Sequence, residues 1–269
     1  MMLKALKELW QYRELVYNLV LRDLKVRYKN SLLGVLWSWL NPLLMMLVFT
    51  FVFNVMQRSS MRDFHIFVLS GLLPWNFFSA AVMGGLFSVT GNSHLIKKVY
   101  FPREILPIST VLSGLVNFII SLPVLFLLAL ISGVPLSAWV LLLPLPILVQ
   151  TCFTIGFVFF LSTLEVFYRD THMVMDVGIL AWFFLTPIWY SVQQVAERAT
   201  LLGVQFSPRR LLFWLNPMAS IINTYQDLVY YGQLTTWDFL ARTAITAVIV
   251  LVLGYAFFLR FRGRFGEEL

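Results

Sequence analysis

The stretch HLIKKVYFPREILP, residues His94–Pro107, separates two long apolar runs, and its charges help to set how the chain crosses a membrane. Lys97, Lys98, Arg103 and Glu104 fall within it, although only 12% of the 269 residues are charged, against about a quarter in an average soluble domain. The whole sequence is 59% hydrophobic, with a mean hydropathy of +0.81, which suits a lipid environment. The sequence therefore predicts an all-α integral membrane protein in which this stretch forms an aqueous loop.

Six apolar segments are long enough to cross a membrane, since a spanning helix needs about 20 residues. Pro144 and Pro146 are expected to split the fourth segment or delay its start, and Pro123 to kink the third. The first thirty residues mix charged and apolar side chains, so we expect no cleaved signal peptide. The predicted spans are Ser31–Met56, Phe64–Thr90, Ile105–Ser132, Ala138–Leu164, Met173–Val192 and Trp237–Phe261.

The distribution of positive charge predicts the orientation of these spans. Fourteen of the 20 Lys and Arg residues lie before the first span, after the second and fourth spans, or in the C-terminal tail. Cytoplasmic loops carry the excess of Lys and Arg, so both termini are expected on the cytoplasmic side of the plasma membrane. The six cations of the opposite side are Arg58, Arg62, Arg198, Arg209, Arg210 and Arg242.

Residues 1–30 are expected to form a cytoplasmic amphipathic helix at the membrane surface, and residues 31–269 the six-span domain. The alternative is a helix in solvent whose Lys and Arg residues only set the orientation of the chain in the membrane. The predicted apolar side holds Leu9, Tyr12, Val16, Val20 and Leu24, and the polar side holds Glu14, Asn18, Arg22, Lys25 and Lys29.

The outer segment 193–236 is too long for a simple connection and is still strongly apolar. Pro208 and Pro217 are expected to divide it into short helices that dip into the membrane or lie on it. These helices form either a gate over an exit or an interfacial loop anchored by Trp214, Tyr225, Tyr230 and Tyr231.

The sequence lacks the motifs that several kinds of enzyme, metal protein and transporter require. No GxxxxGK[ST] motif occurs, so the chain is not expected to hydrolyse ATP, and the net charge of +7 follows membrane sides, which argues against a nucleic-acid partner. His65, His94 and His172 are scattered, and no acidic residue lies at a span centre, which disfavours a metal site and ion-coupled transport. We predict no catalytic residue and no metal ligand. A membrane glycan or lipid transferase would need clustered acidic pairs, which the loops do not offer.

Aromatic residues are abundant, with 25 Phe, 10 Tyr and 9 Trp. Flat rings can stack on the C–H faces of sugars, so a subset could line a passage; the alternative is lipid-facing bulk. The candidates are Trp37, Trp39, Phe49 and Phe53 in the first span, and Trp182, Phe183, Trp189 and Tyr190 in the fifth.

Six motifs carry a resemblance to a known family. GVLWSWLNPLL (34–44), SGLLPWNFFS (70–79), FPREILP (101–107), VFYRD (166–170), FLTPIWY (184–190) and LNPM (215–218) occur in this order. In order and spacing they resemble the membrane subunits of type-2 ABC exporters, and most closely the branch that exports O-antigen, capsule or teichoic acid. Exporters of drugs, antibiotics or lipids share the six-span plan and stay open as an alternative.

The resemblance implies a homodimer with a channel on its two-fold axis, lined by spans one and five. It implies two copies of a P-loop ATPase subunit that hold ATP and Mg²⁺, and a lipid-linked polysaccharide as substrate. It also implies a coupling helix at about Gly91–Tyr100, within the loop 91–104, that docks on the ATPase; alternatively these cations only fix the topology. The implied ATPase contacts are His94, Lys97, Lys98, Tyr100, Arg103, Glu104, Tyr168, Arg169 and Asp170, and the implied outer gate holds Trp214, Asn216, Pro217, Tyr225 and Tyr230.

Overall fold

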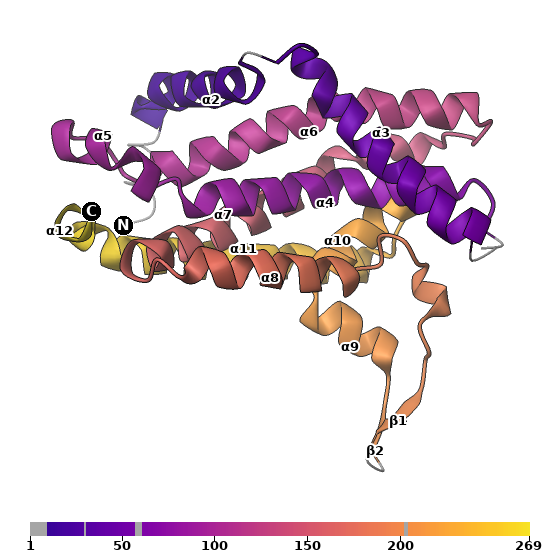
Figure 1. Ribbon diagram of the computed structural model, residues 1–269. Coiled ribbons are helices and arrows are strands. Elements are labelled where there is room, and N and C mark those ends of the chain that lie inside the picture. The colour runs from indigo at the N-terminus through magenta and orange to yellow at the C-terminus, as the bar shows by residue number, and fades with distance from the viewer. Residues whose placement is uncertain (1–9, 30, 57–60, 202–203) are drawn as a thin grey trace.

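The computed structural model describes residues 10–29, 31–56, 61–201 and 204–269 as a bundle of long helices with short helices at both ends (Figure 1). Leu9, Lys4, Lys7 and Arg58, which entered the sequence predictions, lie outside the described residues. The helices are α2 (Arg13–Tyr28), α3 (Trp37–Thr50), α4 (Phe64–Leu86), α5 (Ser93–Lys98), α6 (Ile105–Ile131), α7 (Pro144–Phe167), α8 (Thr171–Phe184), α9 (Pro208–Leu215), α10 (Pro217–Gln226), α11 (Trp237–Phe261) and α12 (Phe265–Glu268).

Five helical segments in the described ranges are long and apolar enough to cross a membrane. They correspond to predicted spans one, two, three, four and six, and they support a multi-pass membrane protein. Their bounds, including adjoining helical turns, are Gly34–Phe53, Phe64–Leu86, Ile105–Ile131, Ala138–Phe167 and Trp237–Glu268.

The predicted fifth span, Met173–Val192, needs correction, because helix α8 ends at Phe184 and has 14 residues. Such a helix is about 21 Å long, shorter than the roughly 30 Å of hydrocarbon. Pro187 explains the early end, since proline lacks an N–H donor and disfavours helical geometry in the residue before it. The chain then continues irregularly, with Thr186, Pro187 and Ile188 buried in the protein.

The fourth span begins late, as predicted from its prolines. Residues Ala138–Leu142 form a 3₁₀ turn, and the α-helix proper starts at Pro144. Proline is well tolerated at the first helical position, where its missing N–H has no partner to lose. Pro146 falls within the same first turn, so the helix is delayed and not split.

Helix α4 lies at the centre of the bundle, with most of its residues buried, and packs against α3, α6, α7, α8 and α10. By contrast, α3 buries only Ser38, Pro42 and Met46, and α8 buries no residue. Both peripheral helices expose apolar side chains. In a membrane these faces must contact lipid or another polypeptide.

Glycines allow α7 and α11 to approach closely. A Cβ on Gly254 would stand 2.0 Å from the carbonyl oxygen of Gly156, and a Cβ on Gly156 would stand 2.5 Å from the backbone of Leu251. Small residues permit such contact between membrane helices, where van der Waals packing drives association.

The N-terminal helix α2 packs on its own chain and not only on a membrane surface. Its Leu19 joins a buried cluster with Phe101, Ile105 and Leu106 at the start of α6, and Val16 packs against the same cluster. The predicted apolar side is therefore largely a protein-packing face. Burial against α6 removes this apolar area from water as lipid would, and the place of α2 at the membrane surface stays a prediction.

The outer segment begins with a β-hairpin that the sequence did not predict. Strands β1 (Ala199–Leu201) and β2 (Val204–Phe206) pair antiparallel, and the hairpin projects away from the helices (Figure 1). The predicted short helices follow as α9 and α10. Each starts with a proline at its first position and a capping side chain, Ser207 for α9 and Asn216 for α10.

Candidate functional site

The loop between α4 and α6 contains the predicted short helix. A 3₁₀ turn, Thr90–Asn92, leads into α5, and its Leu95 and Ile96 pack inward against the cluster around Leu19. The presence of a helix in this loop is confirmed. The side chains left exposed on it and just after it are His94, Lys97, Lys98, Val99 and Tyr100.

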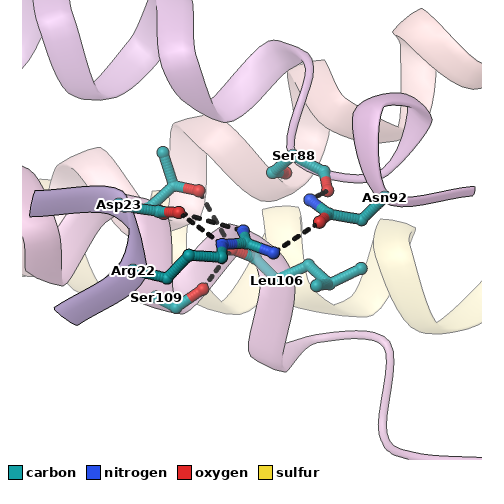
Figure 2. A network of polar contacts seen from close by, with 7 residues as sticks. Arg22, Asp23, Ser88, Asn92, Leu106 and Ser109 are labelled. Carbon is teal, nitrogen blue, oxygen red and sulfur yellow. Dashed lines mark hydrogen bonds and ion pairs between the residues drawn. The ribbon is translucent and has the colours of Figure 1, made fainter. Parts of the chain in front are cut away.

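A polar network fixes the start of this loop to helix α2 (Figure 2). Arg22 donates a hydrogen bond of 3.0 Å to the side-chain oxygen of Asn92, whose amide nitrogen donates at 2.8 Å to the carbonyl oxygen of Ser88. Asp23 pairs with Arg22 at 2.9 Å and orients the guanidinium. Sequence reasoning placed Arg22 on a polar face but could not find Asn92, which lies 70 residues away.

The first turn of α6 is tied to the C-terminal tail. Glu104, expected among the residues that face the ATPase, is 0% exposed, and both its carboxylate oxygens accept from Arg262, at 2.9 and 3.1 Å. Arg103 donates to the carbonyl oxygen of Arg262. The structure therefore places Glu104 within the chain's own packing and off the exposed face, because a buried carboxylate needs an internal cation.

The short connection between α7 and α8 exposes Tyr168, Arg169 and Asp170. Beneath it, the buried Glu165 accepts hydrogen bonds from the backbone N–H of His172 and from its ring Nδ1, both at 3.1 Å. This pair sets the start of α8. The connection lies at the same end of the bundle as α5 and α12, so the two expected ATPase contacts share one face (Figure 1).

An aromatic strip joins the C-terminal ends of α3 and α8 and the segments that directly follow them. Phe53 stacks on Trp189 at 4.8 Å between centroids, Phe49 contacts Phe183 at 5.7 Å, and Trp189 meets Tyr190 at 4.8 Å. The structure thus brings together five of the eight predicted lining residues, from segments more than 120 residues apart. We refer to Phe49, Phe53, Phe183, Trp189 and Tyr190 as the aromatic strip.

The other three lining candidates lie elsewhere. Trp182 points into the bundle, where its ring meets Phe78 at 5.1 Å and its indole N–H donates to Asn216. Trp39 donates its indole N–H at 2.6 Å to the carbonyl oxygen of Ile120 in α6. Trp37 borders a separate cavity described next.

A cavity of about 670 Å³, which we call the polar cavity for its three amides, lies on α4 and is bordered by α2, α3 and α6, with Ile179 as its one lining residue from α8. Within the described part of the chain, no Asp or Glu borders it, and Arg27 is its one charged lining residue. It is bordered by three amides, by the serine hydroxyls at 38, 79 and 121, by the Tyr28 hydroxyl, and by aromatic rings. Its lining is Arg27, Tyr28, Trp37, Ser38, Asn41, Pro42, Leu73, Asn76, Phe77, Ser79, Ala80, Met83, Asn117, Phe118, Ser121 and Ile179.

Three of the predicted gate residues lie within the packed part of the segment that follows α8, where hydrogen bonds and buried contacts fix them. Asn216 accepts from the Trp182 indole at 2.7 Å and from the backbone N–H of Ala219 at 3.0 Å, and its amide nitrogen donates to the Leu185 carbonyl and the Thr186 hydroxyl. Pro217 begins α10. Tyr225 is buried, and its ring packs on Phe118.

The remaining two gate residues lie near the surface. Tyr230 donates its hydroxyl to the carbonyl oxygen of Arg62, which ties the outer segment to the start of α4. Trp214 is exposed and lies beside the Arg242 guanidinium, 5.5 Å from its ring centroid. Among the described residues, no group of three or more His, Cys, Asp or Glu side chains is placed to hold a metal ion.

Comparison with known proteins agrees with this architecture. The family profile described as "ABC-2 type transporter" matches residues 14–230. An O-antigen export system permease protein RfbA from Myxococcus xanthus is 35% identical over 268 residues, covering 100% of both chains, and one from Klebsiella pneumoniae is 34% identical, covering 92% of both. The polysialic acid transport protein KpsM of Escherichia coli is 22% identical, covering 90% of this chain and 92% of that one. With the family profile matched over most of its length and with full-length relatives, the chain belongs to the ABC-2 type transporter family.

Proposed function

We propose that this chain is the membrane subunit of an ATP-driven exporter that moves a lipid-linked polysaccharide out of the cytoplasm across the plasma membrane. The observation that carries the substrate class is the relation to O-antigen permeases over the full length of both chains. The aromatic strip beside a polar cavity gives that class a physical basis, because rings stack on sugars while amides and hydroxyls hydrogen-bond to them.

Energy would come from a separate P-loop ATPase that holds ATP and Mg²⁺. In this proposal α5 docks on that partner with Lys97, Lys98 and Tyr100, and Tyr168 and Arg169 make a second contact. Force can pass from the ATPase to the membrane helices only through a stiff joint. The Arg22–Asn92 bond and the Glu104–Arg262 ion pair supply such stiffness, since they hold both ends of the loop to other helices.

Two copies of the chain would form the channel, with α3 and α8 facing the two-fold axis and the segment after α8 completing a sixth crossing. Helix α8 buries no residue and α3 buries only three, so both leave apolar faces free for a second copy. A single bundle of this size has its centre filled by α4, so a passage needs a second subunit. The termini and α5 would lie in the cytoplasm, as the positive charge indicates.

The test is display of surface polysaccharide in cells that lack the gene, complemented by variants. Wild type should restore display and copurify with a P-loop ATPase. Lys97→Glu with Lys98→Glu should abolish both display and copurification, whereas Arg198→Glu on the outer hairpin, the matched control, should change neither. Display that persists without the chain, or a charge-reversed loop that still binds the ATPase and exports, would refute the proposal.

A further inference from the structure

The polar cavity bordered by α2, α3, α4 and α6 reaches a depth in the bundle where polar side chains are unusual. Asn76 is the thirteenth of 23 residues in α4, and Asn117 holds the equivalent position near the middle of the 27-residue α6. Ten residues of helix separate Asn76 from the end of α4, which is about 15 Å, or half the hydrocarbon thickness. Side-chain amides at this depth are costly unless they are hydrogen-bonded.

Only one of the three amides is used by the protein itself. The oxygen of Asn117 accepts from the Ser38 hydroxyl at 2.8 Å and from the Tyr28 hydroxyl, and this triad joins α2, α3 and α6. The side chains of Asn41 and Asn76 have no hydrogen-bonding partner among the described residues, although both border the cavity. Two amides are therefore free to bond to whatever fills it.

The hydroxyls of the cavity complement these amides. Ser79 and Ser121 donate to carbonyl oxygens of their own helices, at 3.4 and 2.7 Å, so their oxygens remain acceptors toward the cavity. An amide offers both donors and an acceptor. A fitting ligand thus donates and accepts several hydrogen bonds within a small volume and carries no positive charge that would need a carboxylate.

The cavity and the aromatic strip are linked through two neighbouring helices. Ile179 borders the cavity, and Phe183 of the strip follows one helical turn, about 6 Å, further along α8. Asn76 is adjacent in sequence to Trp75, whose ring meets Phe183 at 5.6 Å. Hydrogen-bonding groups and aromatic rings are therefore found on neighbouring turns of α4 and α8.

We infer that this cavity is a saccharide-binding site, in which Asn41 and Asn76 hydrogen-bond to the hydroxyls of an uncharged sugar unit of the exported chain while Trp37 stacks on it. The inference rests on the proposed function and adds to it the residues that select for sugar. A volume of about 670 Å³ is large enough for a few sugar rings, and the arrangement of amides with an aromatic face matches their mixed surface. Sugar units would pass from this polar site to the aromatic strip.

The test compares Asn41→Leu with Asn76→Leu, made singly and together in the complex with its ATPase. Leucine nearly preserves volume, and neither substitution removes an intramolecular hydrogen bond, so the complex should stay monodisperse. The probe is the radiolabelled surface polysaccharide of the source bacterium, freed from lipid by mild acid, in a saturation-binding assay. Each lost hydrogen bond should weaken binding several-fold, and the double variant about tenfold or more. Asn76→Gln, which keeps the amide, should retain most binding.

Controls separate the possible occupants. Thr246→Val, which changes a polar residue of α11 bonded only to its own helix, should bind and export as wild type does. Inorganic diphosphate should not compete; competition that disappears in Arg27→Gln would overturn the inference in favour of a phosphate site. Leucine variants that bind and export normally would show that the cavity holds only water and would also overturn it. Failure of the proposed function is distinct, because the wild-type chain would then restore no polysaccharide display.

Discussion

The buried ion pair between Glu104 and Arg262 predicts a loss of stability whose magnitude depends on which partner is removed. The Glu104 side chain is fully buried, whereas the Arg262 side chain is 38% exposed. Arg262→Gln leaves a carboxylate buried without its cation, at an expected cost of about 2–3 kcal/mol, below the 3–5 kcal/mol of a fully buried pair because one partner reaches solvent. Glu104→Gln leaves a neutral amide that still accepts a bond, and the freed guanidinium can turn to water, so the expected cost is about 1 kcal/mol.

The assay is the free energy of unfolding of the chain in bicelles, measured by steric trapping for both single variants and the double variant. The cycle should give a coupling energy of about 1 kcal/mol or more, because the double variant leaves no unpaired charge. Arg260→Gln, on the exposed side of the same helix, is the matched control and should stay within about 0.5 kcal/mol of wild type. Equal costs for the two single variants, or no coupling, would refute the account of the tail as a buried electrostatic contact.

Three further predictions concern other parts of the structure. Gly254→Ala should cost about 2–3 kcal/mol or prevent folding, since its methyl would stand 2.0 Å from a carbonyl oxygen of α7, while Gly263→Ala, which meets no neighbour within 4 Å, should be silent in the same unfolding assay. Asn216→Ala should cost about 2–4 kcal/mol and raise the mobility of the Trp182 indole, seen as a loss of fluorescence anisotropy; an unchanged signal would contradict the four-bond assignment. Burial raises the pKa of Asp227 in the outer segment, so its protonated form is favoured in the fold. The stability that this gives is present at pH below the ordinary carboxyl value of about 4 and is lost as pH rises through the raised pKa. The melting temperature of Asp227→Asn should therefore rise increasingly above that of wild type as the pH is raised from about 4, and a constant difference would contradict this.

The sequence alone was sufficient for features that depend on local composition. Spans two, three and six are long apolar runs with charged ends, and the hydrophobic effect places such runs in lipid whatever their neighbours are. The late start at Pro144 follows equally from a local rule, because proline lacks an N–H donor, whereas the short helix at Ser93–Lys98 was predicted only from the family resemblance. Family membership was predicted from six short motifs, since their order and spacing carry more information than any one of them.

The tertiary structure decided everything that depends on which distant residues meet. No local pattern distinguishes the buried Glu104 from the exposed Lys98, because the partner of Glu104 lies 158 residues away on the C-terminal tail. The apolar side of α2 has the same periodicity whether it contacts lipid or α6. Only the tertiary structure shows that it packs against the start of α6. The sequence also does not show which of the predicted lining aromatic residues are buried. Trp182 points into the core while Phe183 faces α3, because adjacent helical positions point about 100° apart. Composition thus determined where the chain meets lipid, whereas long-range contacts, which only folding brings together, determined which side chains are left to meet a substrate or a partner.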